Sequence, residues 1–241
     1  MKKDYHVVSY SGGKDSTAML LLMLEHKMPI DRIIFIDLTK EYPDLYAHNE
    51  KVNRYLEQFN LRIESIKVDY DYWFAEHEKT KGKNKGKKGY GWPTPLIRWC
   101  TALKRSTVKK IVKEESVGKN VVEYHGIAND ERERVITDDG RVIRYPLIDL
   151  GYTEKDCLEY CYSKGYDWNG LYRHLSRVSC YCCPLAKMDN LRSIYKYYPH
   201  LWKNMLDMDD KTDTRFKYNK TLRDLDNKFR MEKDNPQKNL F

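Results

Sequence analysis

Short apolar runs alternate with amphipathic segments through the first part of the chain. The β-prone run 5–10 ends at a glycine turn, and the apolar residues of 16–25 predict a buried helix directly after it. The runs 32–38 and 62–68 predict a second and a third strand, with a helix over 44–59 between them. Strands and helices in this alternation form a mostly parallel sheet with helices on both faces.

The same alternation continues further along the chain. The pattern predicts a helix over 101–115, a fourth strand over 120–127 and a fifth over 142–148. Thr153 is followed by acidic residues, as is typical of a helix N-cap, and predicts a helix that ends at about residue 164. We therefore expect an α/β fold with a doubly wound, mostly parallel sheet of five strands.

Two stretches depart from this pattern. Residues 79–91 carry lysines and four glycines without apolar periodicity, which predicts a mobile surface loop inserted in the first domain. From residue 168 onward the chain is rich in Tyr, Cys and Trp, and it then becomes helical and highly charged. We predict an α/β domain over 1–167 and a cysteine-containing, mainly helical C-terminal subdomain over 168–241.

Composition and charge narrow the classes of function. The chain has 44 Lys+Arg against 36 Asp+Glu, and the net charge of +8 favours an anionic partner, although a solvated basic surface would explain it equally well. The longest apolar run, 18–24, is far shorter than the roughly 20 residues that cross a bilayer. We expect a cytoplasmic protein, in which the six cysteines serve as thiols, metal ligands or cluster ligands rather than disulfides.

The sharpest motif lies between the first predicted strand and the first predicted helix, and consists of Ser11, Gly12, Gly13, Lys14, Asp15 and Ser16. Two glycines let backbone amides approach a phosphate, and the helix N-terminus adds positive potential. The spacing is neither that of a Walker A loop nor that of the dinucleotide fingerprint. A glycine turn capped by a side chain would explain Gly-Gly alone, whereas the six residues together predict an anion cradle.

The six residues resemble the SGGKDS signature of the PP-loop ATP pyrophosphatases, in the adenine nucleotide alpha hydrolase-like superfamily. The run DLTKEYP over 37–43 is similar to the D-T-G-x-E-F-P element of the phosphoadenosine phosphosulfate (PAPS) reductase family, with Thr39 where that family usually has Gly. Carboxylates at the C-terminal end of a parallel strand face the ligand crevice. Asp37 or Glu41 is therefore expected to bind ribose hydroxyls or Mg²⁺; alternatively, Asp37 only caps a loop.

Two further segments resemble phage-type and DNA-phosphorothioation relatives in the same family. RWCTALK over 98–104 is similar to R-W-C-T-x-x-L-K, and GIANDERER over 126–134 is similar to G-I-R-x-D-E-x-x-R. Ala128 replaces the first Arg of the second segment, which removes one bidentate contact to a 3′-phosphate or sulfate. The resemblance implies that Gly126 and Arg134 lie beside the nucleotide. Alternatively, Arg132 and Arg134 are surface ion-pair partners in the run ERER, and a function is expected for Arg134 rather than for Arg132.

The cysteines form the strongest metal signal. Cys180 and Cys183 form a C-x-x-C pair, a spacing that lets two thiolates hold one metal centre, and Cys100 is a third candidate ligand. The fourth ligand is ambiguous, with Cys182 the nearest candidate. In related sulfonucleotide reductases and phosphorothioation proteins a cysteine quartet holds an iron–sulfur cluster, so the resemblance implies a cluster, with zinc as the alternative. A redox-active or merely buried C-x-x-C is the remaining alternative.

The other cysteines limit the chemistry. Cys157 and Cys161 are four residues apart on a predicted helix, so we expect both to be buried small hydrophobes on one face. Thiol-dependent sulfonucleotide reductases carry their nucleophile in a C-terminal E-C-G-x-H motif, whereas this sequence has no cysteine after Cys183. We therefore expect that the usual thiosulfonate intermediate does not form on this chain.

These features together predict a cytoplasmic enzyme whose domain 1–167 binds ATP and Mg²⁺. The enzyme is expected to adenylate an acceptor with release of pyrophosphate, so that sulfur can then be transferred to the acceptor. Lys14 would neutralise the leaving pyrophosphate, and Asp15 or Asp37 would place Mg²⁺. We expect the acceptor to be a nucleic acid, tRNA or DNA, whose phosphate backbone the lysine loop contacts. The other expected partner is a sulfur-donor protein. Alternatively, the lysine loop is only solvated and binds no nucleic acid. Two rival functions are a sulfonucleotide reductase with an external thiol and a nucleotide-binding redox or regulatory module without turnover.

Overall fold

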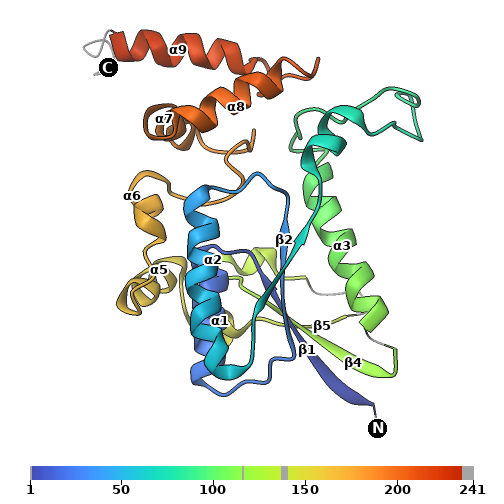
Figure 1. The fold of residues 1–241 in the computed structure, drawn as a ribbon, viewed down its shortest axis with the longest axis vertical. Coiled ribbons are helices and arrows are strands. Elements are labelled where there is room, and N and C mark those ends of the chain that lie inside the picture. Colours follow the sequence, from blue (N-terminus) through green and yellow to red (C-terminus); the bar gives the residue numbers. More distant parts are fainter. Residues whose placement is uncertain (1, 116, 137–140, 235–241) are drawn as a thin grey trace. The chain divides into compact units, whose positions relative to one another are not determined.

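The computed structural model describes residues 2–115, 117–136 and 141–234, and within them a five-stranded sheet in the order β3-β2-β1-β4-β5 (Figure 1). Every strand pair is parallel. The strands are β1 (Lys3–Tyr10), β2 (Arg32–Asp37), β3 (Ile63–Lys67), β4 (Lys119–His125) and β5 (Val142–Arg144). The predicted α/β fold with a parallel five-stranded sheet is confirmed.

Nine α-helices lie in the described residues: α1 (Lys14–Glu25), α2 (Pro43–Leu56), α3 (Trp99–Glu115), α4 (Pro146–Asp149), α5 (Glu154–Ser163), α6 (Leu171–His174), α7 (Met188–Tyr197), α8 (Pro199–Asp209) and α9 (Leu222–Asp234). Short helical turns add Glu57–Phe59, Tyr72–Glu76, Asn129–Arg134 and Trp168–Gly170. In these residues no helix is both long and apolar enough to cross a membrane.

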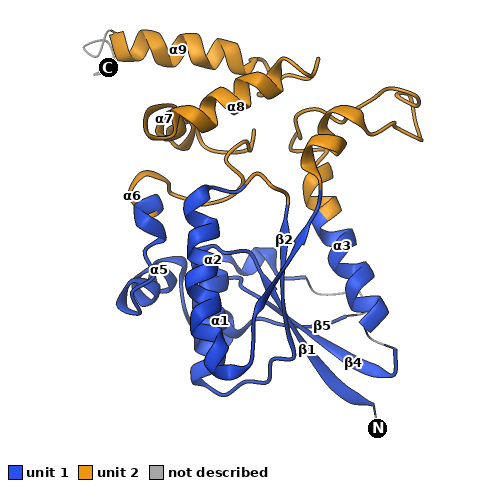
Figure 2. Ribbon diagram, viewed as in Figure 1, with its two compact units in different colours: residues 1–37, 41–68, 104–171 blue, residues 38–40, 69–103, 172–241 orange. Residues whose placement is uncertain are grey.

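The chain forms two compact units (Figure 2). Unit 1 comprises residues 1–37, 41–68 and 104–171 and contains the sheet, whereas unit 2 comprises 38–40, 69–103 and 172–241. The stretch 69–103, assigned to the first domain by sequence, clusters with the helical C-terminal region instead. The predicted domain boundary between residues 167 and 168 stays a prediction. The two compact units have other boundaries, the last of which falls between residues 171 and 172.

The sheet of unit 1 is buried on both faces. On one face Val7, Ile34 and Ile36 pack against apolar residues of α3, namely Val108, Ile111 and Val112. The side chains that alternate with them point to the other face, where the Tyr10 hydroxyl lies 3.1 Å from Thr17 Oγ1 of α1 and 3.2 Å from His48 Nε2 of α2. Helices therefore cover both faces, as the alternating pattern predicts.

The region after β4 agrees with the sequence except at β5. The strand predicted over 142–148 is wrong beyond Arg144, because Pro146 lacks an amide hydrogen and stands at the first turn of α4. The predicted N-cap at Thr153 is confirmed. Thr153 Oγ1 accepts a hydrogen bond from the Asp156 amide, and the Asp156 carboxylate accepts one from the Thr153 amide, which closes a capping box at α5.

Unit 2 is held together by buried tryptophans. Trp92 Nε1 donates a hydrogen bond to Asp209 of α8 (2.7 Å), and Trp202 Nε1 donates one to Asp226 of α9 (2.8 Å). The lysine-rich stretch 79–91 runs along the surface, and a short antiparallel bridge between Glu78 and Lys88 closes its base. The segments 69–103 and 172–234 thus pack against each other within one compact unit.

Candidate functional site

The loops that follow β1 and β4 leave the sheet at its switch point, because β1 lies between β2 and β4. In parallel α/β sheets this is where ligands bind. A Cβ atom at Gly126, directly after β4, would lie only 3.0 Å from the backbone nitrogen and Cα of Ser16. Gly126 therefore permits a close approach to the first turn of α1, and the structure brings these two predicted segments together.

The loop after β1 has the geometry of an anion cradle. Gly12 has a left-handed φ of +77°, and Gly13 is the N-cap of α1 without a side-chain hydrogen bond to the first turn. Ser16 Oγ donates to the Gly13 carbonyl (3.1 Å) and accepts from the Ser11 amide (3.2 Å), which fixes the turn. An α1 N-terminus without a side-chain cap attracts anions through its amides and its dipole.

Trp168 and His48 support the loop after β1 through a hydrogen bond and ring stacking. Trp168 Nε1 donates a hydrogen bond to the Gly12 carbonyl (2.7 Å), and the Trp168 ring stacks on His48 at 4.3 Å between centroids. His48 Nε2 also lies 3.0 Å from Thr17 Oγ1. The sequence reasoning missed this support, because Trp168 is 156 residues away from Gly12 and no local pattern connects them.

His48 should make stability depend on pH. Its burial, and after that the charge of Lys51, lower the pKa of His48 from 6.5 to about 3. The unfolded chain takes up this proton below about pH 6.5 while the folded chain does not, so the free energy of unfolding should fall by about 1.4 kcal/mol per pH unit as pH drops from about 6 to about 4. His48→Gln should remove this part of the slope, measured by denaturant unfolding at each pH.

The matched control is His26→Gln, at the exposed end of α1, which should keep the wild-type slope. Equal slopes for wild type and His48→Gln would contradict the assignment of a neutral, buried imidazole behind the loop.

Lys14 lies in a group of carboxylates that the sequence only partly indicated. Its Nζ is 2.9 Å from Asp15 Oδ1 and 2.7 Å from Glu154 Oε1, at the start of α5. Carboxylate oxygens of Asp15, Glu131 and Glu154, the carboxylate triad, all lie within 4.8 Å of one another. Glu131 lies in the segment 126–134, and Glu154 lies in the first turn of α5 directly after the N-cap Thr153. Both are therefore part of segments that the sequence singles out, although neither was predicted as a site residue.

The electrostatics of the carboxylate triad show a crowded negative site. Burial raises the pKa of Asp15, and Glu154 and Glu131 raise it further, together outweighing the opposite effect of Lys14. Burial alone would lower the pKa of Lys14, but Asp15 and Glu154 outweigh it and the pKa is raised. Lys14 therefore keeps its charge at neutral pH, and the carboxylates gain from any additional cation.

The predicted Arg134 lies in the same neighbourhood, where its guanidinium forms an ion pair with Glu131 of the carboxylate triad. Asp130 accepts a hydrogen bond from the Glu154 amide (2.9 Å), which joins the loop after β4 to the start of α5. Ala128 is completely buried at the N-cap of the helical turn Asn129–Arg134. The segment after β4 thus supplies a carboxylate and a guanidinium to this site.

The candidate metal-ligating cysteines all lie in unit 2. Burial, and after it the thiols of Cys182, Cys100 and Cys180 in that order, raise the pKa of Tyr70, so these three thiols act electrostatically on one buried hydroxyl. Cys183 follows in the same turn, with its amide donating to the Cys180 carbonyl (3.2 Å). Cys182 is buried, whereas Cys100, Cys180 and Cys183 are partly exposed. Thiols from two distant segments in one compact unit suit a thiophilic metal or cluster.

The remaining two cysteines have the structural role that their spacing predicts. Cys157 and Cys161 are fully buried on one face of α5, and Cys161 Sγ donates to the Lys14 carbonyl at 3.5 Å. Burial raises the pKa of both thiols, so they stay protonated. Their expected role as small buried hydrophobes is confirmed.

The sequence of the chain matches that of the phosphoadenosine phosphosulfate reductase domain over residues 5–186. The chain belongs to this family. An uncharacterized protein of Methanocaldococcus jannaschii is 26% identical over 207 residues, which cover 82% of this chain and 40% of that protein. The chain therefore spans well under half the length of this relative.

Two solved structures show partial likeness to this PAPS reductase family member. A tRNA thiolase from Methanococcus maripaludis with a 4Fe–4S cluster has 12% identity and a TM-score of 0.46, over 87% of this chain and 72% of that one. An FMN adenylyltransferase from Candida glabrata in complex with ATP has 18% identity and a TM-score of 0.31, over 59% and 41%. Neither likeness supports an inference about activity.

The carboxylates of the family segment 37–43 lie at the end of β2 and after it, and their expected contacts to ribose or Mg²⁺ stay a prediction. Asp37 is buried and accepts a hydrogen bond from the Tyr46 hydroxyl (2.8 Å), whereas Glu41 is buried 3.1 Å from Lys104 Nζ. Neither belongs to the carboxylate triad. Thr39 has a φ of +59°, in the left-handed region that a β-branched residue rarely adopts and that glycine adopts readily.

Proposed function

We propose that this PAPS reductase family member binds ATP and adenylates an acceptor, with release of pyrophosphate, as the activating step of a sulfur transfer. The observation that supports this most is the joint placement of the uncapped first turn of α1, the charged Lys14 and the carboxylate triad. Amides at a helix N-terminus bind phosphate oxygens, and a lysine beside them stabilises charge on a leaving phosphate.

The carboxylate triad fits Mg²⁺, which prefers oxygen ligands and is commonly held by one or two carboxylates together with substrate phosphates. The raised pKa of Asp15, caused by burial and the neighbouring carboxylates, reflects negative charge that a dication would offset. When bound, Mg²⁺ would neutralise charge on the phosphates of ATP. Asp15, Glu131 and Glu154 would hold the Mg²⁺ ion. The sequence predicts Asp15 or Asp37 for this role; Asp15 is kept, and Glu131 and Glu154 take the place of Asp37.

The chain's own residues would then position the nucleotide. The loop 11–13 and the amides of the first turn of α1 would bind the phosphates, with Gly126 leaving room beside them. Lys14 would shift from its carboxylate partners toward the departing pyrophosphate, and Arg134 would stay paired to Glu131 at the rim. Asp37 and Glu41, at the end of β2, remain the proposed contacts to ribose.

We further propose that Cys100, Cys180, Cys182 and Cys183 hold an iron–sulfur cluster, with zinc as the alternative. The assignment is supported by the tight turn that joins Cys180 to Cys183 and by the placement of Cys100 in the same compact unit. A cluster would supply a place to hold sulfur or hand it on.

Labelled ATP tests the reaction class directly. The purified chain is incubated with Mg²⁺ and either α-labelled or γ-labelled ATP, in the presence of total cellular RNA as acceptor source. Adenylation predicts labelled AMP, free or on the acceptor, together with labelled pyrophosphate. Labelled ADP and phosphate would overturn the proposal, and so would sulfite release from PAPS with a thioredoxin-type donor in the absence of AMP formation.

Glu131→Gln should raise the Mg²⁺ concentration needed for half-maximal pyrophosphate release roughly tenfold, because one carboxylate of the triad is lost while the side-chain volume is kept. Mn²⁺ binding measured by calorimetry should weaken in parallel. Glu133→Gln, at an exposed position in the same helical turn, is the matched control and should leave both quantities unchanged. If the two variants behave alike, the carboxylate triad is not the metal site.

A further inference from the structure

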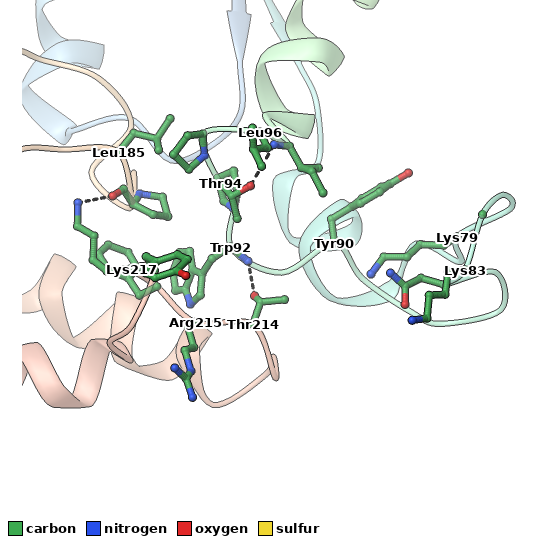
Figure 3. A pocket seen from close by; sticks show the side chains of 18 of the residues that line it. Lys79, Lys83, Tyr90, Trp92, Thr94, Leu96, Leu185, Thr214, Arg215 and Lys217 are labelled. Carbon is green, nitrogen blue, oxygen red and sulfur yellow. Dashed lines mark hydrogen bonds between the residues drawn. The ribbon is translucent and has the colours of Figure 1, made fainter.

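Unit 2 contains a large open pocket that the proposed adenylation does not use. Its volume is about 1100 Å³, slightly above the roughly 300–1,000 Å³ of small-molecule sites. Figure 3 shows that it is lined by the lysine loop, the segment 90–97, the residues after Cys183 and the turn 214–218. A site of this size and openness suits a polymer better than a metabolite.

The floor of the pocket is rigid and aromatic. Trp92 and Phe216 are almost completely buried and meet edge to face at 4.9 Å between ring centroids. The Trp92 amide donates to Thr214 Oγ1 (2.7 Å), which fixes the segment 90–97 to the turn 214–218 (Figure 3). The surface is therefore preorganised for binding.

The rim presents apolar groups to solvent. Tyr218 is 100% exposed at the tip of a tight turn between the bridged residues Lys217 and Lys220, and Leu96 is 96% exposed. Ile97 is also exposed. Such a concentration of exposed large apolar side chains around one concavity marks an interaction surface.

The charge of the pocket is of one sign. Its lining includes five cationic residues, namely Lys79, Lys81, Lys83, Arg215 and Lys217, and no Asp or Glu among the described lining residues. Lys217 Nζ donates hydrogen bonds to the carbonyls of Pro184 and Ala186, and burial lowers the pKa of Lys217, so its role is to hold the segment after Cys183. Four cations thus remain around an aromatic concavity, the combination that binds bases by stacking and phosphates by charge.

We propose that this pocket binds an unpaired loop of an RNA. The fully exposed ring of Tyr218 would stack on an unstacked base, while Lys81, Lys83 and Arg215 would contact the backbone phosphates. RNA is favoured over DNA because its loops already expose unpaired bases, whereas duplex DNA must first be unstacked at a cost of a few kcal/mol. Pro184 and Leu185 line the pocket directly after Cys183, so the bound loop would lie next to the proposed cluster ligands. The inference rests on the proposed function only in treating this RNA as the acceptor.

Fluorescence anisotropy without ATP tests the proposal. The probes are a labelled RNA hairpin with an unpaired loop, the same RNA fully paired, single-stranded DNA of the loop sequence, and polyglutamate. The hairpin should bind most tightly. Tyr218→Ala should weaken its binding by about 5- to 100-fold, as expected for the loss of one stacking platform. Lys81→Gln/Lys83→Gln should reduce the slope of log affinity against log salt by about 1.4.

Matched controls lie outside the pocket. Tyr197→Ala removes a half-exposed tyrosine of α7, and Lys109→Gln/Lys110→Gln removes two exposed charges of α3. Both should bind the hairpin like wild type, and thermal melting checks that all variants fold. Equal weakening by controls and pocket variants would overturn the proposal, as would equal binding of paired RNA or single-stranded DNA, or tighter binding of polyglutamate.

The outcome separates this inference from the proposed function. If the hairpin fails to bind while ATP is still cleaved to AMP and pyrophosphate, the RNA pocket is wrong and adenylation stands. If the hairpin binds as expected while ATP yields ADP, adenylation is wrong and the RNA pocket stands.

Discussion

Lys14→Met should slow the formation of pyrophosphate from ATP by about 10²–10³-fold, the cost of removing one preorganised charge from a developing anion. Lys14 is only 8% exposed and holds its charge through Asp15 and Glu154, so water cannot replace its ammonium group efficiently. The rate is measured as labelled AMP formed from α-labelled ATP at saturating Mg²⁺. Methionine keeps an unbranched side chain only one heavy atom shorter than that of lysine, so the main change is the loss of the charge.

The matched control for Lys14→Met is Lys155→Met, which removes a cation next to Glu154 in sequence but at an exposed position on α5. It should retain the wild-type rate. Thermal melting separates loss of activity from loss of fold, since Lys14→Met leaves two carboxylates without their buried partner. A folded Lys14→Met variant with the wild-type rate would show that the phosphates do not bind at this loop.

The parts of the fold that sequence predicts are those set by local pattern. The run from β1 through the glycine loop to α1 is confirmed because apolar periodicity fixes the strand and helix, and a glycine must stand at the left-handed Gly12. The capping box at Thr153 is local in the same way. The predicted strand 142–148 fails for a local reason too, since Pro146 starts a helix within it.

The parts of the site that sequence missed depend on long-range placement. Trp168 reaches the Gly12 carbonyl from beyond the fifth strand, and Glu154 reaches Lys14 across 140 residues of chain. Such contacts follow from strand order, because the loops after β1 and β4 converge only once β1 lies between β2 and β4. A sequence reader could find Glu131 and Glu154 by asking which acids follow those strands and open neighbouring helices.

The cysteine centre combines both kinds of information. The C-x-x-C pair is a local signal, whereas the electrostatic effect of Cys100 and Cys182 on the buried Tyr70 hydroxyl appears only in the folded unit. Tyr70 itself carries no recognisable motif, yet a buried hydroxyl can donate a hydrogen bond to a ligating sulfur. Such outer partners orient ligands and tune the metal they hold.

Cys180→Ala/Cys183→Ala should abolish the bound cluster. Purified without oxygen, the wild-type chain is expected to show the broad visible absorption of an iron–sulfur cluster with matching iron and sulfide contents, and the double variant should lose all three. The reason is that two thiolates of the proposed quartet disappear together, and the turn between Cys180 and Cys183 places both partly exposed thiols in the same short segment of unit 2.

Cys157→Ala/Cys161→Ala is the matched control, because it also removes two cysteines but from the face of α5 that lies beneath the loop of Lys14. It should keep the absorption, iron and sulfide of wild type. Stoichiometric zinc that is lost only from Cys180→Ala/Cys183→Ala would assign the same ligands to zinc and remove the cluster from the proposed sulfur transfer. Retention of iron and sulfide in Cys180→Ala/Cys183→Ala would place the cluster ligands elsewhere and overturn the quartet.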